Sequence, residues 1–175
     1  MKIQRRTLLL TAAAGAASTL LAACGGGDDD LGDIVAVAQA TPDFSILVEA
    51  VAAAGLVNTL KGSGPFTVFA PTNAAFAAAL TELSLTKEQL LASPLLGDIL
   101  KYHVVSGRVL KANVPVGVDI PTVLGATETF QINSALAITD EIGRVANITA
   151  TDVLTSNGVI HVIDKVILPS AFLPA

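Results

Sequence analysis

Tryptophan is absent from this sequence, and cysteine, methionine and tyrosine occur once each. A single cysteine excludes an internal disulfide and any metal cluster held by several thiolates of the same chain. Aromatic residues make up 4% of the chain and charged residues 14%, so the core must consist mainly of Ala, Val, Leu and Ile. Basic residues are outnumbered by acidic ones, and the formal net charge of -5 argues against a nucleic-acid partner.

Sequence motifs that would indicate catalysis are missing as well. There is no G-x-S-x-G nucleophile elbow, no G-x-x-x-x-G-K-[ST] phosphate loop and no H-E-x-x-H zinc pair. After residue 30 the only adjacent acidic pair is Asp140-Glu141, which we expect in a solvated loop, with weak cation binding as the alternative. We therefore predict a protein that is not an enzyme and holds no metal or cofactor.

The first 23 residues are typical of a secretory signal peptide. Lys2, Arg5 and Arg6 form a basic start, and residues 7–23 are an apolar run. This run is slightly shorter than the roughly 20 residues that cross a bilayer, so an uncleaved transmembrane anchor is the weaker alternative. The letters RRTLL at residues 5–9 also resemble a twin-arginine signal, with Leu8 where Phe is more usual, and so suggest an export route.

The end of the apolar run predicts lipid attachment. Leu21-Ala22-Ala23-Cys24 resembles a bacterial lipobox, in which the cysteine sulfur receives a diacylglycerol and becomes the first residue after cleavage. Residues 24–30, CGGGDDD, would then be a flexible and solvated tether that reaches at most about 25 Å. Gly25 directly after the cysteine resembles outer-membrane lipoproteins of Gram-negative cells. We expect an exported protein that is lipid-anchored at the cell envelope.

Residues 31–169 have the pattern of one α+β domain, followed by a short tail at residues 170–175. Capping residues and helical spacing predict helices in the first half of the domain. The expected helices cover residues 34–40 with Asp33 as cap, 43–54, a segment capped by Thr72 or Asn73, 87–92 with a Thr86/Gln89 capping box, and 94–100.

Strands are expected mainly in the second half. The segment 66–70 is apolar on both faces and therefore predicts a buried strand. The last strand, Gly158–Leu168, is also apolar on both faces and is predicted to be central, with Asn157-Gly158 as the turn before it. The other expected strands are 102–107, 108–110, 129–132, 135–139 and 145–150.

Three segments together resemble the signatures of the fasciclin domain family. They are GPFTVFAPTNAAF at residues 64–76, LKYHVVSG at 100–107 and NGVIHVIDKVILP at 157–169, in the family's order and at its usual spacing. The resemblance covers about residues 31–169. It implies a wedge of two packed β-sheets with helices over one side and one edge, used as an extracytoplasmic adhesion or binding module.

The first of these segments contains no ionisable group, and we interpret it as a folding motif. Phe66, Phe69 and Phe76 would fill the core, while the Thr72 hydroxyl and the Asn73 amide would bind unpaired backbone groups at the start of a helix. Direct contact with a ligand is the weaker alternative for this segment.

The resemblance also implies candidate binding residues. In animal members of the family, integrin contact has been assigned to a Tyr-His segment and to an Asp-Ile segment. Tyr102-His103 matches the first of these, and Asp152-Val153 matches the second with Val in place of Ile. The match is positional, since a bacterial lipoprotein has no obvious integrin partner. For His103, and equally for His161, the stronger interpretation is a buried, hydrogen-bonded structural residue.

Two functional hypotheses remain. The first is a lipid-anchored adhesion module that binds extracellular matrix, a polysaccharide or a surface protein. The second is a carrier of an apolar small molecule such as a carotenoid or lipid, held between the helices and the sheet. The lack of tryptophan and the single tyrosine weaken this second hypothesis, because they leave few aromatic rings to stack on a ligand.

Overall fold

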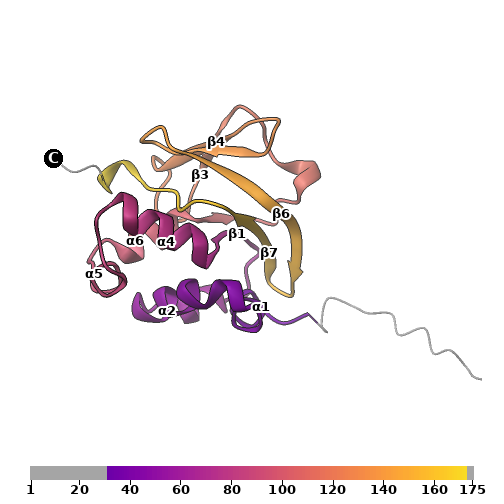
Figure 1. Cartoon of the computed structure of the whole chain (residues 1–175). Helices are drawn as coiled ribbons and strands as arrows, with labels where there is room; N and C mark the ends of the chain where they lie inside the picture. Colours follow the sequence, from indigo (N-terminus) through magenta and orange to yellow (C-terminus); the bar gives the residue numbers. More distant parts are fainter. Residues whose placement is uncertain (1–30, 173–175) are drawn as a thin grey trace, which may run out of the picture.

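The computed structural model describes residues 31–172 (Figure 1). The predicted signal peptide, Cys24, the tether and the last three residues of the predicted tail lie outside this range. Within it, helices dominate the first half of the chain and strands the second, which confirms the mixed α+β content. The helices are α1 (Ile34–Ala40), α2 (Ser45–Ala53), α3 (Val57–Leu60), α4 (Asn73–Glu82), α5 (Lys87–Leu91) and α6 (Leu96–Tyr102), and the short 3-10 turns are η2 (Pro42–Phe44), η3 (Lys111–Asn113) and η4 (Ser170–Phe172).

Side-chain caps begin three of these helices, as the sequence predicts. The Asp33 carboxylate accepts a hydrogen bond from Ala36 N at 2.7 Å at the start of α1. Thr72, rather than Asn73, caps α4. At α5, Thr86 and Gln89 form the predicted capping box, with bonds of 3.2 and 2.8 Å. These bonds satisfy amide groups that have no partner inside the helix.

Two predicted helix starts are wrong by a few residues. Pro42–Phe44 forms a 3-10 turn, so α2 begins at Ser45 rather than at Asp43. The helix predicted from Pro94 begins at Leu96, because the Ser93 hydroxyl accepts a bond from Leu95 N and closes a turn there.

Seven strands form one hydrogen-bonded order, β2-β1-β7-β6-β5-β4-β3. Strand β7 lies between β1, its parallel neighbour, and β6, its antiparallel neighbour, which confirms the prediction of a central last strand. Because the pairing is continuous, the predicted wedge of two packed sheets is not confirmed. The strands are β1 (Phe66–Pro71), β2 (Val104–Ser106), β3 (Asp119–Pro121), β4 (Thr129–Ile132), β5 (Ala137–Thr139), β6 (Val145–Thr155) and β7 (Gly158–Ile163).

Several strand bounds differ from the predictions. Strand β6 continues to Thr155, and β3 had no recognised signal in the sequence. Residues 108–110 form no strand, because Val109 bonds the side chains of Thr67 and His161 instead of a neighbouring strand. Strand β7 ends at Ile163 rather than Leu168, and the residues that follow bond to side chains from other parts of the fold.

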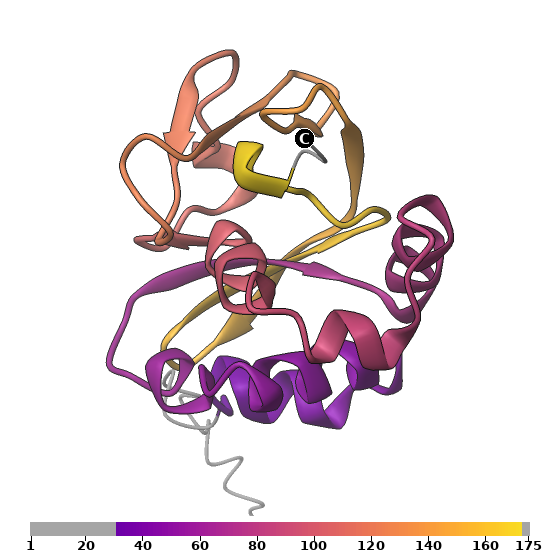
Figure 2. The same ribbon diagram turned by 90° about the vertical axis from the view of Figure 1, so that its left-hand side faces the viewer.

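Strands β1 and β7 separate two hydrophobic clusters. Val68 and Ala70 of β1 face the first cluster, in which α1, α2, α4 and α6 pack on the sheet. Phe69, between them in the strand, faces the second cluster, which also contains Tyr102 and Phe130 and lies against strands β3–β6. Figure 2 shows the helices gathered on one side of these two strands and most of the remaining strands on the other.

None of the helices in residues 31–172 is by itself long and apolar enough to cross a membrane. The pair Ile34–Ala40 and Pro42–Ala53 meets the length and composition together, with a bend of 110° between them.

Candidate functional site

Tyr102, the first predicted binding residue, is the last residue of α6 and is fully buried. Its hydroxyl donates a hydrogen bond to Thr129 O at 2.5 Å and accepts one from Glu141 N at 3.3 Å. The ring packs edge-on against Phe130. Burial raises the pKa of the Tyr102 phenol, so it remains a neutral donor at physiological pH. The side chain joins α6 to β4 and to the turn between β5 and β6.

His103 is buried and bound through both ring nitrogens. Nδ1 donates to Ile99 O at 2.7 Å, and Nε2 accepts from Ile167 N at 3.2 Å. These partners require the neutral ring with its proton on Nδ1. Burial lowers the pKa of His103 to about 4, and the nearby Arg144 guanidinium adds to this effect. These contacts confirm that His103 is buried and hydrogen-bonded, as the structural interpretation predicts.

His161, in β7, is buried in the same way. Its Nε2 donates to Val109 O at 2.8 Å, and its Nδ1 accepts from Asp152 N at 3.3 Å. The ring also packs against Phe69, with 5.4 Å between the ring centroids. Both nitrogens are thus occupied by main-chain groups, so His161 is buried and hydrogen-bonded as predicted.

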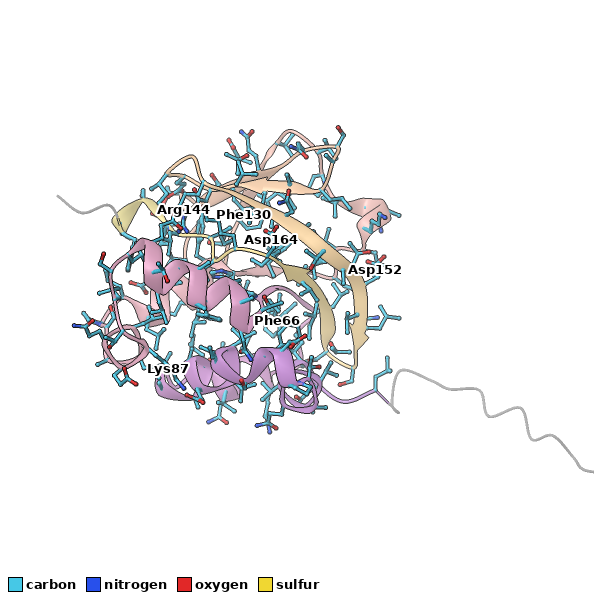
Figure 3. All side chains as sticks on the ribbon, viewed as in Figure 1. Phe66, Lys87, Phe130, Arg144, Asp152 and Asp164 are labelled. Carbon is cyan, nitrogen blue, oxygen red and sulfur yellow. The ribbon has the colours of Figure 1, made fainter. Side chains whose placement is uncertain are left out.

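Asp152 is exposed and lies at an irregularity of β6. The pairing of β6 with β7 shifts register between Ala150 and Val153, and Asp152 has a left-handed backbone with φ of 59°. Its carboxylate accepts a hydrogen bond from Lys111 N at 2.8 Å. Val153 is half-buried and packs against the first cluster. The bulge therefore presents one acidic side chain in a fixed position on the outer surface, as Figure 3 shows.

The structure does not bring the two predicted binding pairs together on one surface. Phe69 lies between them: its amide donates to His103 O at 2.9 Å, and its ring contacts both Phe130 and His161. Asp152 is exposed, whereas Tyr102 and His103 are buried. A partner could touch Tyr102 or His103 only if this part of the fold opened. Their assignment to a binding site stays a prediction.

The Asp140-Glu141 pair lies in a turn, but the expectation of a solvated loop is wrong for Asp140. This carboxylate is 5% exposed and accepts hydrogen bonds from the amides of Ile142, Arg144 and Leu168. Glu141 accepts bonds from the amides of Thr129 and Ser170. The spacing of Asp140 from Ile142 and Arg144 is that of an Asx turn, a local signal that sequence reasoning missed.

Residues 31–172 contain no group of three or more His, Cys, Asp or Glu residues placed to bind a metal ion. In the same part of the chain, every hydrogen bond of the two histidine rings is to a main-chain group. Such rings are held in place rather than directed at a nucleophile or a substrate. The polar groups that are brought together here therefore join elements of the fold.

An apolar cavity of about 80 Å³ lies between the first three helices and strands β1 and β7. Its lining is almost wholly hydrocarbon, with Lys101 and Gln39 among the few polar residues. A cavity of this size is smaller than the engineered cavities of about 150 Å³ that bind benzene. Representative lining residues are Ile34, Val48, Val51, Leu60, Val68 and Ile160.

This architecture, a seven-stranded mixed sheet with helices packed on β1 and β7, matches a known class of structure. The structure of a domain pair from the insect cell adhesion molecule fasciclin I superposes with a TM-score of 0.67 at 18% identity. The match covers 78% of this chain and 51% of that chain, so the present chain spans about half the length of that pair.

Sequence comparisons identify the family. Residues 42–169 match the sequence profile of the fasciclin domain. Protein sll1483 of Synechocystis sp. is 45% identical over 139 residues, which is 78% of this chain and 73% of that protein. Immunogenic protein MPB70 of Mycobacterium bovis is 40% identical over 147 residues, which is 79% of this chain and 70% of that protein. The chain belongs to the fasciclin domain family.

Proposed function

We propose that the protein is a non-catalytic adhesion module that acts at the cell surface, anchored there by a lipid on Cys24. The observation that carries this proposal is its fold, which it shares with a domain pair of an insect cell adhesion molecule. The ligand would be extracellular matrix, a polysaccharide or a surface protein. Both histidines are buried and bonded to main-chain groups, so neither ring is free to act as a catalytic base.

We place the proposed contact at the β6 bulge. Asp152 is exposed there, and its bond to Lys111 N holds the carboxylate in a defined direction. Tyr102 and His103 would not touch the ligand. They would support the strands beneath the bulge through the packing around Phe69. A contact around one exposed carboxylate is small, so we expect a single domain to bind weakly. Many copies in one membrane would compensate, because each further contact becomes effectively intramolecular.

The test compares the lipidated full-length protein in vesicles with the Cys24→Ser protein, which has no site for the lipid. Vesicles carrying the lipidated protein should adhere to cells of the organism that produces the protein. The Cys24→Ser protein without the lipid should bind these cells weakly. Equal binding by the two forms would overturn the avidity argument. If mass spectrometry of the membrane-extracted protein shows no lipid on Cys24, the lipid anchor itself is wrong.

The position of the contact is tested separately by Asp152→Asn. Asparagine tolerates the left-handed backbone and can still accept the bond from Lys111 N, so stability should hardly change. We expect vesicle adhesion to fall severalfold because the charge is lost. Asp119→Asn is the matched control, since Asp119 is an exposed acid on another strand with its own side-chain partner, Gln131. Equal adhesion by both variants would show that the contact does not lie at the bulge.

The apolar cavity supports the second candidate, a carrier of an apolar small molecule. The cavity is smaller than a carotenoid or a lipid tail, so binding would require the helices to move apart. Val48→Phe would fill the cavity. Val37→Phe is the control, because Val37 is half-buried but does not line the cavity. A carrier would bind an apolar fluorescent fatty acid stoichiometrically, and Val48→Phe alone would abolish this binding. Unchanged binding by Val48→Phe would exclude the cavity as the site.

A further inference from the structure

The segment after β7 is held in an unusual way. Residues 164–172, called the strap below, run from the end of β7 past α4 toward the C-terminus, as the yellow chain in Figure 1 shows. The strap has no strand pairing along Val166–Ser170. Instead, its amides donate to side chains: Ile167 N to His103, Leu168 N to Asp140 and Ser170 N to Glu141, at 3.2, 3.0 and 2.8 Å. All three acceptors are titratable.

The strap also closes both hydrophobic clusters. Val166 and Leu168 belong to the first cluster and Ile167 to the second, and each is at most 4% exposed. A void of about 10 Å³ lies beneath the strap, lined by apolar residues of α4, α5 and α6 together with Val166 and Leu168. Opening of the strap would therefore expose the apolar groove between these helices, although β7 itself is held on both sides by other strands.

His103 can accept the bond from Ile167 only when it is neutral. Its Nδ1 proton is committed to Ile99 O, so Nε2 must carry the lone pair. A second proton would go to Nε2, where it would meet the Ile167 N–H and leave a buried positive charge. A protonated ring therefore cannot keep the bond to Ile167 N, so protonation of His103 weakens the closed strap.

The charged groups around His103 differ in how they change the effect of acid on the closed strap. Arg144, in the β5–β6 turn, repels a second positive charge, and the Arg144 guanidinium is paired with Glu82 of α4, which also pairs with Lys165 of the strap. Burial raises the pKa of Asp140, so acid does not weaken the closed state through that carboxyl. For Glu141, burial raises the pKa, but hydrogen bonds from Ser170 and Thr129 outweigh it and leave the pKa lowered. Acid therefore also weakens the closed state through Glu141, but only below the ordinary glutamate pKa of 4.5, so between pH 6.5 and 4.5 it acts mainly through His103.

We propose that the strap is a pH-sensitive closure whose opening is coupled to the uptake of one proton by His103. At neutral pH the ring accepts the Ile167 amide and the strap is closed. As the pH falls, the open state, in which His103 is hydrated and protonated, gains in population. This coupling is independent of what the outer surface of the domain binds.

The size of the effect follows from proton linkage. The pKa of His103 is about 4 in the closed state and 6.5 for an ordinary histidine. Between these two values the open state binds one proton more than the closed state. The opening equilibrium should therefore increase about tenfold for each pH unit lost.

Hydrogen exchange by NMR at several pH values between 7 and 4 tests this coupling, with protection factors that remove the intrinsic pH dependence of exchange. The Ile167 and Leu168 amides should be less protected than the β7 amides, and their protection should fall about tenfold per pH unit between pH 6.5 and 4.5, where Glu141 does not yet contribute. His103→Gln keeps a donor and an acceptor without titrating in this range, so its strap amides should lose this dependence. His161→Gln, which removes the other histidine, should keep it.

Two results would overturn the proposal. Equal protection of strap and β7 amides at every pH would show that the strap opens only in global unfolding. Retention of the full pH dependence by His103→Gln would assign the proton to another group. Should His103→Gln not fold, the wild-type comparison of strap and β7 amides, together with His161→Gln, still decides between these outcomes.

Discussion

Asn157 connects three parts of the fold through one side chain. Its carbonyl oxygen accepts a hydrogen bond from Ile34 N at 3.0 Å, and its amide nitrogen donates to Leu60 O and Gly62 O at 2.7 and 2.9 Å. The start of α1 and the end of α3 are thereby fixed to the β6–β7 turn. The dipeptide Asn157-Gly158 predicts that turn from the sequence, but it does not predict these long-range partners.

At this scale we predict that Asn157→Ala lowers the free energy of unfolding by about 1–3 kcal/mol, because three main-chain groups lose their partner. Asn157→Asp should cost at least as much, since a carboxylate oxygen would face the carbonyls of Leu60 and Gly62. Denaturant titration measures both. Asn147→Ala is the control, because Asn147 is exposed and its side chain bonds only Asp164, so its cost should be within about 0.5 kcal/mol. Equal midpoints for the two alanine variants would show that Asn157 does not stabilise the fold by connecting these segments.

The parallel pairing of β1 with β7 is the central contact between elements, and it depends on Gly158. A Cβ atom at this position would lie 2.1 Å from Phe66 O and 2.9 Å from the Ile34 side chain. The backbone of β1 approaches so closely that only glycine fits. The same residue therefore positions both β1 and α1.

We predict that Gly158→Ala destabilises the protein by about 3 kcal/mol or more, because β1 would have to move away from β7. Gly97→Ala, in α6, is the matched control: nothing lies within 4 Å of its Cβ position, and alanine favours a helix by up to about 1 kcal/mol. Thermal denaturation should show a lower midpoint for the first variant and an unchanged or higher one for the second. A normal midpoint for Gly158→Ala would mean that the strands separate without cost.

Elements specified by local chemistry could be predicted from the sequence, and elements specified by distant partners could not. Asp33, Thr72 and the Thr86/Gln89 box act within three residues, so their helix starts are correct. Asn73 shows the limit: it binds backbone groups as predicted, but those groups, Ile46 N and Pro42 O, belong to a distant segment.

The same limit applies to the candidate site and to the end of the last strand. Val166, Ile167 and Leu168 continue the alternating pattern of β7, so the sequence alone extends the strand to Leu168. The structure ends β7 earlier because the acceptors for the next amides are His103, Asp140 and Glu141, which are at least 28 residues away in the chain. The sequence suggests Asp152 as a candidate by resemblance only, since nothing in its local sequence indicates a bulge.

At the scale of the whole molecule, the two hydrophobic clusters share their boundaries. Strands β1 and β7 contribute to both, and so does the strap, through Leu168 on one side and Ile167 on the other. Loss of either cluster would expose the apolar face of the shared strands and remove support from the other cluster. We therefore expect the described domain to unfold in a single cooperative step at neutral pH.

The composition of the chain allows this expectation to be measured without labels. Tyr102 is the only tyrosine, tryptophan is absent, and Tyr102 lies in the second cluster, whereas most of the helices pack on the first. Tyrosine fluorescence therefore reports the second cluster, and far-UV circular dichroism reports mainly the helices. At pH 7 the two denaturant curves should have the same midpoint and slope. A tyrosine transition at lower denaturant than the helical one would show that the second cluster unfolds independently and that the shared strands do not couple the two.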